Sequence, residues 1–308
     1  MSELHKFLFE GQPVRGMLVR LTDDWREVLR RRTFEPPVRD LLGEMAAAGV
    51  LMQAGIRFDG ALVMQMMGDG PIKLAVAEVQ NDLAFRATAK LVGELPDDAV
   101  LQQMLNAHGR GRCAITLDPK DKSAGQQPYQ GVVSLVDGER QPLATLAEVL
   151  AHYMRQSEQL DTQLVLAAND QVAAGLLIQR LPVEGAANLG VMPDDDAYNR
   201  IAQLAATLTR EELLTLDADT VLRRLFWEED LRRFEPQAPR FACSCSRERV
   251  RGMLRNLGPE EVDGIVAERG TVEIGCEFCG LQYHFDAVDA AELFTPARNQ
   301  PPGSSSVQ

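Results

Sequence analysis

The sequence predicts an α+β protein with an N-terminal mixed sheet-and-helix core domain, a helical linker and a small C-terminal domain with four cysteines. Three observations support this prediction. Short strand-like runs separated by turns alternate with helices over residues 1–182. A leucine-rich and highly charged stretch follows within residues 183–240. Four of the five cysteines then gather between residues 243 and 279, inside a predicted domain of residues 241–292.

Length and charge limit the class of protein. A chain of 308 residues can form one good core and a second small domain. The formal net charge of −13 disfavours binding to nucleic acid or to an anionic membrane. The N-terminus lacks the pattern of a secretion signal, and no run approaches the roughly 20 apolar residues of a membrane span. We therefore expect a cytoplasmic protein, in which clustered cysteines usually bind metal or do redox work.

The core is predicted to begin with a strand over Val14–Leu21. Thr22-Asp23-Asp24 can cap a helix that runs through Arg31, with acidic side chains near its positive end. Pro36-Pro37 opens a second helix. Its apolar side chains recur at helical spacing and are Leu41, Leu42, Met45 and Ala48.

Strands and turns fill most of the remaining core. Gly68–Pro71 and Asn81-Asp82 are turns, residues 118–130 are a polar loop, and residues 145–160 form a helix. The predicted strands are 61–67, 72–79, 84–91, 113–117, 131–136, 164–168 and 175–178. Short turns between successive strands favour one largely antiparallel sheet with helices packed on it. Pro182 is predicted to end the compact region.

The predicted linker has two parts. Residues 183–200 are rich in Gly, Pro and Asp and are expected to form a loop. Residues 197–234 are expected to be helical, because leucines alternate with dense charge, and Pro236 and Pro239 close the segment. Such a helix has an apolar face that either docks on the core or becomes exposed when the helix is released.

The cysteines form two closely spaced pairs, Cys243-Ser244-Cys245 and Cys276-Glu277-Phe278-Cys279. Zinc takes four ligands in a tetrahedron, and sulfur is one of its preferred donors. Gly280 permits the tight backbone turn that follows a Cys-x-x-Cys pair. The spacing predicts one zinc ion per chain on Cys243, Cys245, Cys276 and Cys279.

The 30 residues between the pairs are expected to form a small fold. Ser246 can cap a helix that Gly258 ends, and Pro259 opens another. Strands are predicted around Val272 and Tyr283. A module of about 50 residues with so few apolar side chains is hard to stabilise alone. A structural metal contributes on the order of 10 kcal/mol, so the module should unfold without zinc. Residues 293–308 are expected to be a disordered tail.

Other interpretations of the cysteines compete with the zinc site. They are two unrelated reduced pairs, or an iron–sulfur cluster, although the flanking spacings do not match those of ferredoxins. His284 lies near the site but is better explained by a surface or packing role, and Cys113 by burial in a strand. A four-sulfur shell has no open position for water, which argues against a zinc hydrolase.

Three roles remain for such a site: a static structural zinc, a nucleic-acid-binding ribbon or a redox sensor. Residues 241–292 hold five basic and ten acidic side chains, which disfavours the ribbon. Cys276 and Cys279 can form a small disulfide loop readily, and Cys243 and Cys245 can do so with more strain. Oxidation would remove the metal ligands.

The chain resembles the heat-shock protein 33 family of bacterial redox-regulated chaperones over about residues 8–290. The C-terminal motif of that family is Cys-x-Cys, about thirty residues and Cys-x-x-Cys, which this chain has. Its core motifs appear as Val14-Arg15-Gly16, as Tyr153 with Ser157-Glu158-Gln159 and Thr162, and as Gln179-Arg180-Leu181-Pro182. Ala174 stands where the family often has a second glycine before Gly175, and the Pro/Gly/Ser-rich tail is outside the family pattern.

The resemblance implies an ATP-independent holdase that binds unfolding proteins and prevents their aggregation under oxidative stress. It implies zinc on the four cysteines in the reduced, inactive form, and disulfides Cys243–Cys245 and Cys276–Cys279 after oxidation and zinc release. The linker then loses structure, client proteins bind, and the oxidised form dimerises. The protein would not be an enzyme, and Ser157 beside Glu158 without a nearby His is a poor nucleophile arrangement.

Two other functions stay open at this point. One is a thiol–disulfide oxidoreductase that uses Cys276 and Cys279, although no βαβ unit surrounds them. The other is an interaction protein with a purely structural zinc, from which mild oxidant would not remove the metal.

Overall fold

The computed structural model describes residues 1–121, 127–182 and 195–295. The chain divides into two compact units, Met1–Ala242 and Cys243–Gln308. The predicted loop over residues 183–194, the middle of the predicted loop over 118–130 and the predicted tail beyond residue 295 lie outside the described residues. Among the described residues, no helix combines the length and the apolar character that crossing a membrane requires.

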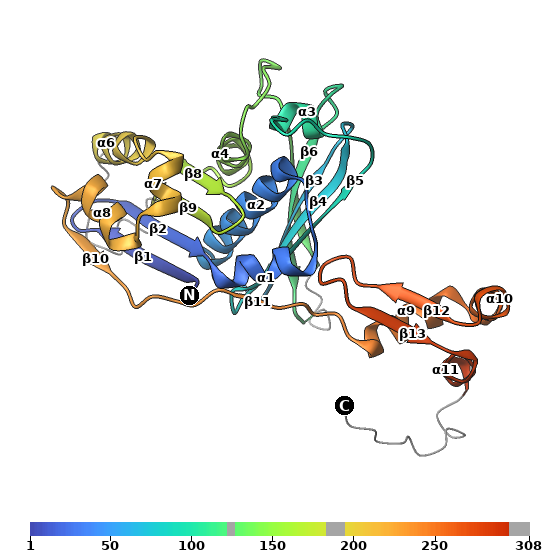
Figure 1. The fold of residues 1–308 in the computed structure, drawn as a ribbon. Helices are drawn as coiled ribbons and strands as arrows, with labels where there is room; N and C mark the ends of the chain where they lie inside the picture. The colour runs from blue at the N-terminus through green and yellow to red at the C-terminus, as the bar shows by residue number, and fades with distance from the viewer. Residues whose placement is uncertain (122–126, 183–194, 296–308) are drawn as a thin grey trace. The chain divides into compact units, whose positions relative to one another are not determined.

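A five-stranded antiparallel sheet forms one half of the first unit (Figure 1). Its strands in spatial order are β10 (Leu231–Arg233), β1 (Glu3–Phe9), β2 (Val14–Leu21), β9 (Ala173–Arg180) and β8 (Thr162–Ala168). Gly16 of β2 has no side chain, and the ring of Phe7 fills the space that a Cβ would need. The first strand of this sheet in chain order, β1, pairs with the last, β10.

A six-stranded sheet forms the other half. Its strands in spatial order are β11 (Arg240–Phe241), β5 (Ala84–Leu91), β4 (Ile72–Gln80), β3 (Gly60–Met67), β6 (Arg112–Pro119) and β7 (Tyr129–Ser134). Spatial neighbours from β5 to β7 pair antiparallel, whereas the short β11 pairs parallel to β5. The expectation of a single sheet was wrong, because β9 pairs with β2 and with β8, and these strands form a sheet separate from β3–β7.

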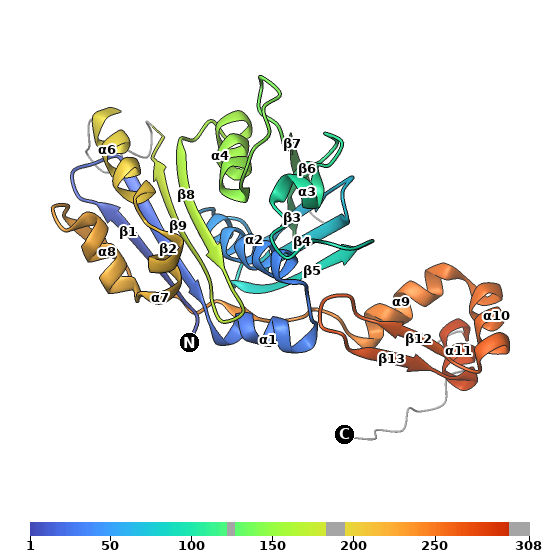
Figure 2. The same ribbon diagram turned by 45° about the horizontal axis from the view of Figure 1, so that its top comes forward.

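Helix α2 (Pro36–Ala54) lies between the two sheets, and Figures 1 and 2 agree on this placement. It packs against strands of both. Most of its side chains are buried, so the helix is apolar on nearly all sides rather than on one stripe. Small residues such as Ala46, Ala47 and Ala48 let both sheets approach closely. This packing makes α2 the centre of the main hydrophobic core.

Three further helices complete the core of this unit: α1 (Asp23–Arg31), α3 (Leu101–Leu105) and α4 (Leu146–Ser157). Thr145 caps α4, because its side chain accepts a hydrogen bond from the Glu148 backbone N–H at 3.2 Å. The predicted cap of α1 was wrong in one respect: Thr22 precedes the helix but its side chain makes no capping hydrogen bond, and its hydroxyl is buried. The indole of Trp25 instead anchors α1 by donating to the Asn169 carbonyl at 2.8 Å.

The predicted helical linker packs on the outer face of the five-stranded sheet as α6 (Asp195–Ala206), α7 (Arg210–Thr215) and α8 (Ala218–Phe226) (Figure 2). Phe226 of α8 contacts Phe9 edge-on at a ring distance of 5.1 Å and Phe7 at 6.1 Å. The predicted apolar face is therefore docked in a second hydrophobic cluster. Two bounds differ from the prediction: α6 begins at Asp195, two residues before the predicted helix start at residue 197, and the last helix ends at Phe226 rather than at residue 234, since residues 231–233 pair with β1.

The second unit contains a helical hairpin, a two-stranded sheet and a last helix. Its elements are α9 (Arg247–Leu257), α10 (Pro259–Arg269), β12 (Val272–Gly275), β13 (Gln282–Phe285) and α11 (Ala287–Phe294). The predicted cap at Ser246 is confirmed, since its side chain accepts from the Arg249 N–H at 3.2 Å, and Gly258 separates α9 from α10 with φ +96°. Residues 293–294, expected in a disordered tail, belong to α11 instead.

Candidate metal centre

The four C-terminal cysteines come together in the second unit. Their Sγ atoms all lie within 4.8 Å of one another. The Sγ atoms of Cys243 and Cys276 are 3.6 Å apart, and those of Cys245 and Cys279 are 3.3 Å apart. Each short separation therefore joins one sequence pair to the other. None of the four forms a disulfide in this structure.

The second cysteine pair sits on the turn between β12 and β13. The Gly280 N–H donates to the Cys276 carbonyl at 2.8 Å, and the Cys276 N–H donates to the Leu281 carbonyl at 2.9 Å. Gly280 has φ +71°, a conformation that L side chains rarely adopt, which confirms why glycine follows Cys279. Pairing of Gly275 with Gln282 holds the base of this turn. The hairpin thus fixes both sulfurs on one side of a rigid loop.

The first cysteine pair precedes α9 and is held by a side chain of that helix. The Arg249 guanidinium donates to the Ser244 carbonyl at 2.9 Å and to the Ser244 hydroxyl at 2.6 Å. Ser246 caps the helix immediately after Cys245. Hydrogen bonds therefore hold Ser244, between the two cysteines, and Ser246, directly after them. Neither bond involves the sulfur of Cys243 or Cys245.

The donor set and its spacing fit a four-sulfur metal site. Zinc–sulfur bonds of about 2.3 Å in a tetrahedron place the sulfurs about 3.8 Å apart. The Sγ separations here, from 3.3 Å to within 4.8 Å, bracket that distance. Four thiols are also the donor set that structural zinc sites use most. The arrangement can hold one metal ion.

The surroundings of Cys279 favour the neutral form of its thiol. Burial, followed by hydrogen bonds with the other three cysteines, raises the pKa of Cys279 to about 12. Tyr283 donates its hydroxyl to Cys245 Sγ at 3.2 Å, and this bond is the main reason that the pKa of Tyr283 rises to about 12. Since thiolates rather than thiols bind metals, loading the site exchanges protons for the ion.

Tyr283 is a site residue that sequence reasoning placed only in a strand. In β13, Tyr283 and Phe285 point to the same face, because side chains alternate along a strand. That face packs on the small core of the unit, whose buried members are Leu254, Val262, Val272, Tyr283, Phe285, Ala290 and Leu293. The alternation predicts burial of Tyr283, but only the fold places its hydroxyl on a sulfur.

Two other candidates from the sequence do not join the cluster. His284 is mostly exposed and its imidazole lies 3.3 Å from the Glu273 carboxylate. Cys113 is fully buried in β6, and burial raises the pKa of its thiol to about 12. Both observations confirm the predicted roles, a surface side chain and a buried apolar one.

The core motif residues form a polar network in the first unit. The Tyr153 hydroxyl donates to the Glu158 carboxylate at 2.9 Å. Arg15 donates through Nε to the Gln179 side-chain oxygen at 3.0 Å, and Gln179 donates to the Thr162 hydroxyl at 2.8 Å. Arg15, Gln179 and Thr162 thus link β2, β9 and β8. Tyr153 separately bonds Glu158 at the end of α4, which agrees with the structural role predicted for Tyr153 and its neighbours.

Comparisons with known proteins agree with the motifs. A family model described as "Hsp33 protein" matches residues 2–286. The chain is 47% identical to the "33 kDa chaperonin" of Methylobacillus flagellatus, with 96% of this chain and 94% of that protein covered. It is 46% identical to the "33 kDa chaperonin" of Chromobacterium violaceum, with 95% and 94% covered.

A solved structure shares the fold. The crystal structure of the 33 kDa chaperonin from Thermotoga maritima superposes with a TM-score of 0.77 at 22% sequence identity, covering 94% of this chain and 97% of that one. At this identity the likeness establishes the α+β architecture alone.

Proposed function

The chain belongs to the heat-shock protein 33 (Hsp33) family, and from this membership we propose that it is a redox-regulated, ATP-independent holdase. The membership supports a chaperone function, and we propose that the protein is not an enzyme. We propose that it binds unfolding proteins in the cytoplasm and prevents their aggregation under oxidative stress. The observation that carries the redox part of the proposal is the gathering of four cysteine sulfurs, none of them in a disulfide, within 4.8 Å of one another.

We propose that the reduced form holds one zinc ion on Cys243, Cys245, Cys276 and Cys279. The spacing and the donor set support this ligand assignment. When bound, zinc supplies a four-way cross-link that neutralises the thiolates and joins the two cysteine segments. The small core of the second unit is too limited to replace such a cross-link, because a structural metal is worth on the order of 10 kcal/mol in modules of this size.

Oxidation is proposed to join Cys243 to Cys245 and Cys276 to Cys279. In each reaction two cysteine thiolates, one hydrogen peroxide and two protons from solvent give one disulfide and two waters. One S–S bond forms, the O–O bond breaks, and the peroxide accepts two electrons. A disulfide sulfur is no longer a thiolate ligand, so the chain would lose its hold on the metal. The pairing within each motif rests on the family resemblance.

The activated form is proposed to release α6–α8 and to dimerise. In the described structure these helices cover an apolar face that includes Phe7 and Phe9. Their release would expose that face to unfolding clients. On this basis we propose that residues 1–182 bind clients and form the dimer, residues 183–240 are the metastable linker, and residues 241–292 are the redox switch. The acidic surface supports protein clients over nucleic acid or membranes.

The test couples two measurements on one sample. Light scattering by a heat-aggregating client reports holdase activity, and a colorimetric chelator reports zinc release during peroxide treatment. We expect one zinc per chain to appear as four thiols disappear, together with suppression of aggregation without ATP. Equal suppression by the reduced, zinc-loaded protein, or turnover in an insulin-reduction assay, would contradict the proposal. Zinc retention under oxidant would favour a purely structural metal.

A further inference from the structure

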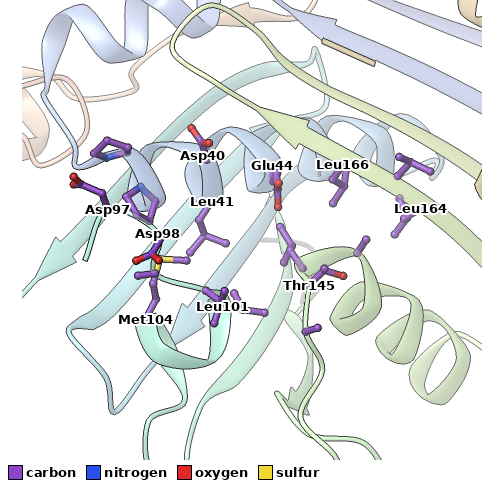
Figure 3. A pocket seen from close by; sticks show the side chains of 18 of the residues that line it. Asp40, Leu41, Glu44, Asp97, Asp98, Leu101, Met104, Thr145, Leu164 and Leu166 are labelled. Carbon is purple, nitrogen blue, oxygen red and sulfur yellow. The ribbon is translucent and has the colours of Figure 1, made fainter. Parts of the chain in front are cut away.

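A cavity of about 560 Å³ opens in the first unit between α2, α3, α4 and β8 (Figure 3). Its volume falls within the range of about 300–1,000 Å³ that is usual for ligand-binding pockets. A short peptide segment with several side chains can fit in such a volume. None of the metal-centre residues lines it, since all of them belong to the second unit. It therefore needs an explanation separate from the thiol cluster.

The cavity has an apolar floor and an acidic wall. The apolar residues of the floor include Leu41, Leu101, Met104, Leu164 and Leu166. Asp40 and Glu44 from α2, and Asp97 and Asp98 from the segment before α3, supply carboxylates. In Figure 3 the Glu44 carboxylate lies between Leu41 and Leu166 and points toward the side where Thr145 lies. None of the described lining residues is Lys, Arg or His, so negative charge dominates the space.

One basic side chain from the proposed linker already reaches this wall. The Arg210 guanidinium of α7 donates to Asp40 Oδ2 at 2.8 Å and lies 3.6 Å from Glu44 Oε1. It also donates to the Ala168 carbonyl. Arg39, the chain neighbour of Asp40, shares that carboxylate at 2.7 Å. Half of the Arg210 side chain is exposed, and Arg210 is not among the residues that line the cavity. The wall thus binds a guanidinium in the resting structure.

The edge of a strand also faces the cavity. Residues 163–166 of β8 are consecutive lining residues, and β8 is the last strand of the five-stranded sheet among the described strands. Alternate residues of an edge strand direct N–H and C=O groups away from the sheet, where an added strand can pair with them. Backbone pairing of this kind tolerates many sequences.

We propose that this cavity binds an extended segment of an unfolding protein in which Lys or Arg alternates with apolar side chains, and that Arg210 occupies the acidic wall until the linker is released. The proposal rests on the proposed chaperone function, because it names the client chemistry that the core would select. Basic side chains would pair with Asp40 and Glu44, apolar ones would cover the leucines, and the backbone would extend β8. Acidic segments would be repelled by the same wall.

The first experiment uses the reduced, zinc-loaded full chain, so that it does not depend on redox activation. The probe is a short fluorescent peptide that alternates Leu with Lys, and anisotropy reports its binding. We expect Arg210→Met to bind the probe about tenfold more tightly than the unaltered protein, because the substitution frees two partly buried carboxylates. Increased salt should weaken this binding. A matched Leu/Glu peptide should not bind.

The second experiment uses the oxidised chain, in which we expect Asp40→Asn with Glu44→Gln to weaken probe binding about tenfold. Glu139→Gln, an exposed acid of the same unit, is the matched control and should leave binding unchanged. If oxidised protein suppresses aggregation while neither Arg210→Met nor the double variant alters probe binding, the inference is overturned and the chaperone proposal stands. If oxidation gives no suppression while Arg210→Met still gains binding, the chaperone proposal fails and the cavity remains a cationic-peptide site.

Discussion

Tyr283 is the side chain that links the thiol cluster to the core of its unit. Its ring is buried among apolar residues and its hydroxyl donates to Cys245 Sγ. A donated hydrogen bond withdraws electron density from a sulfur and makes it a weaker nucleophile toward peroxide. We therefore expect Tyr283 to slow the oxidation of Cys245, in addition to its packing role.

We expect Tyr283→Phe to release zinc about threefold faster during peroxide treatment, since one hydrogen bond to sulfur is lost while the ring remains. Chelator absorbance over time measures the rate. Tyr129→Phe, at a half-exposed tyrosine of β7, is the control and should release zinc at the unaltered rate. Identical rates for the two variants would show that the Tyr283 hydroxyl does not protect the thiol.

Glu44 makes stability depend on pH. Burial raises the pKa of its carboxyl to about 7, Arg210 opposes the rise and Asp40 adds to it. The folded chain then holds this proton more tightly than the unfolded chain does. The contribution of Glu44 to stability is therefore fully present below about pH 4.5 and is lost as pH rises through about 7. One-fifth of the side chain reaches solvent, which limits the effect to at most about 3 kcal/mol.

We expect Glu44→Gln to gain stability relative to the unaltered protein between pH 5 and pH 8, because the amide cannot ionise. Urea unfolding followed by fluorescence of the buried Trp25 measures the first unit in the full chain. Glu139→Gln is the control, and its free energy of unfolding should differ from that of the unaltered protein by the same amount at pH 5 and at pH 8. A Glu44→Gln difference that does not change with pH would contradict the burial argument.

At the scale of elements, the docking of α8 depends on an aromatic contact. Phe226 is buried against Phe7 and Phe9, whereas the next residue, Trp227, is mostly exposed. We expect Phe226→Ala to destabilise the docked helix by about 3 kcal/mol or more. The reduced, zinc-loaded variant should then bind an apolar dye and suppress client aggregation in part.

Trp227→Ala removes a large side chain from the same helix end and serves as the matched control for Phe226→Ala. It should leave dye binding and light scattering unchanged, because its ring contributes little burial. Equal behaviour of the two variants would argue that α8 is not held by the aromatic cluster, and would weaken the proposed role of α6–α8 as a releasable cover.

Elements with strong local patterns were predictable from the sequence. Turn residues bracketed β3, β4 and β5 within one residue at each end, and the Pro pair located the start of α2. The strand β10 was not predictable, because pairing with β1 holds it in an extended form after a run of acidic residues. The contacts of α7 were not predictable either, because its Arg210 donates a hydrogen bond to Asp40, which lies 170 residues earlier in the sequence. Cysteine spacing predicted the thiol cluster, whereas the Tyr283 contact required the fold.

At the scale of the whole molecule, the two units have different sources of stability. The first has two large hydrophobic clusters, and the second has a cluster of seven buried residues and the thiols. We expect chelation of zinc from the reduced protein to abolish amide protection in β12 and β13 while β4 and β9 stay protected. Hydrogen exchange with mass spectrometry measures both regions in one sample. If β12 keeps its amide protection after chelation, or if β4 and β9 both lose theirs, the two units do not have separate sources of stability.

Restoring zinc provides the control for that experiment. Metal added back under reducing conditions should recover protection in β12 and β13, whereas metal added after oxidation should not, because disulfide sulfurs do not ligate it. Recovery in the oxidised sample would mean that groups other than the four thiols hold the ion.

The pairing of β1 with β10 has a consequence for synthesis on the ribosome. During synthesis, strand β1 waits for its partner β10, which is translated more than two hundred codons later. Until then Phe7 and Phe9 lack the cover that Phe226 provides. A nascent chain therefore exposes an apolar surface that the folded protein buries. We expect ribosome-bound intermediates of this chain to be prone to aggregation until β10 has been translated.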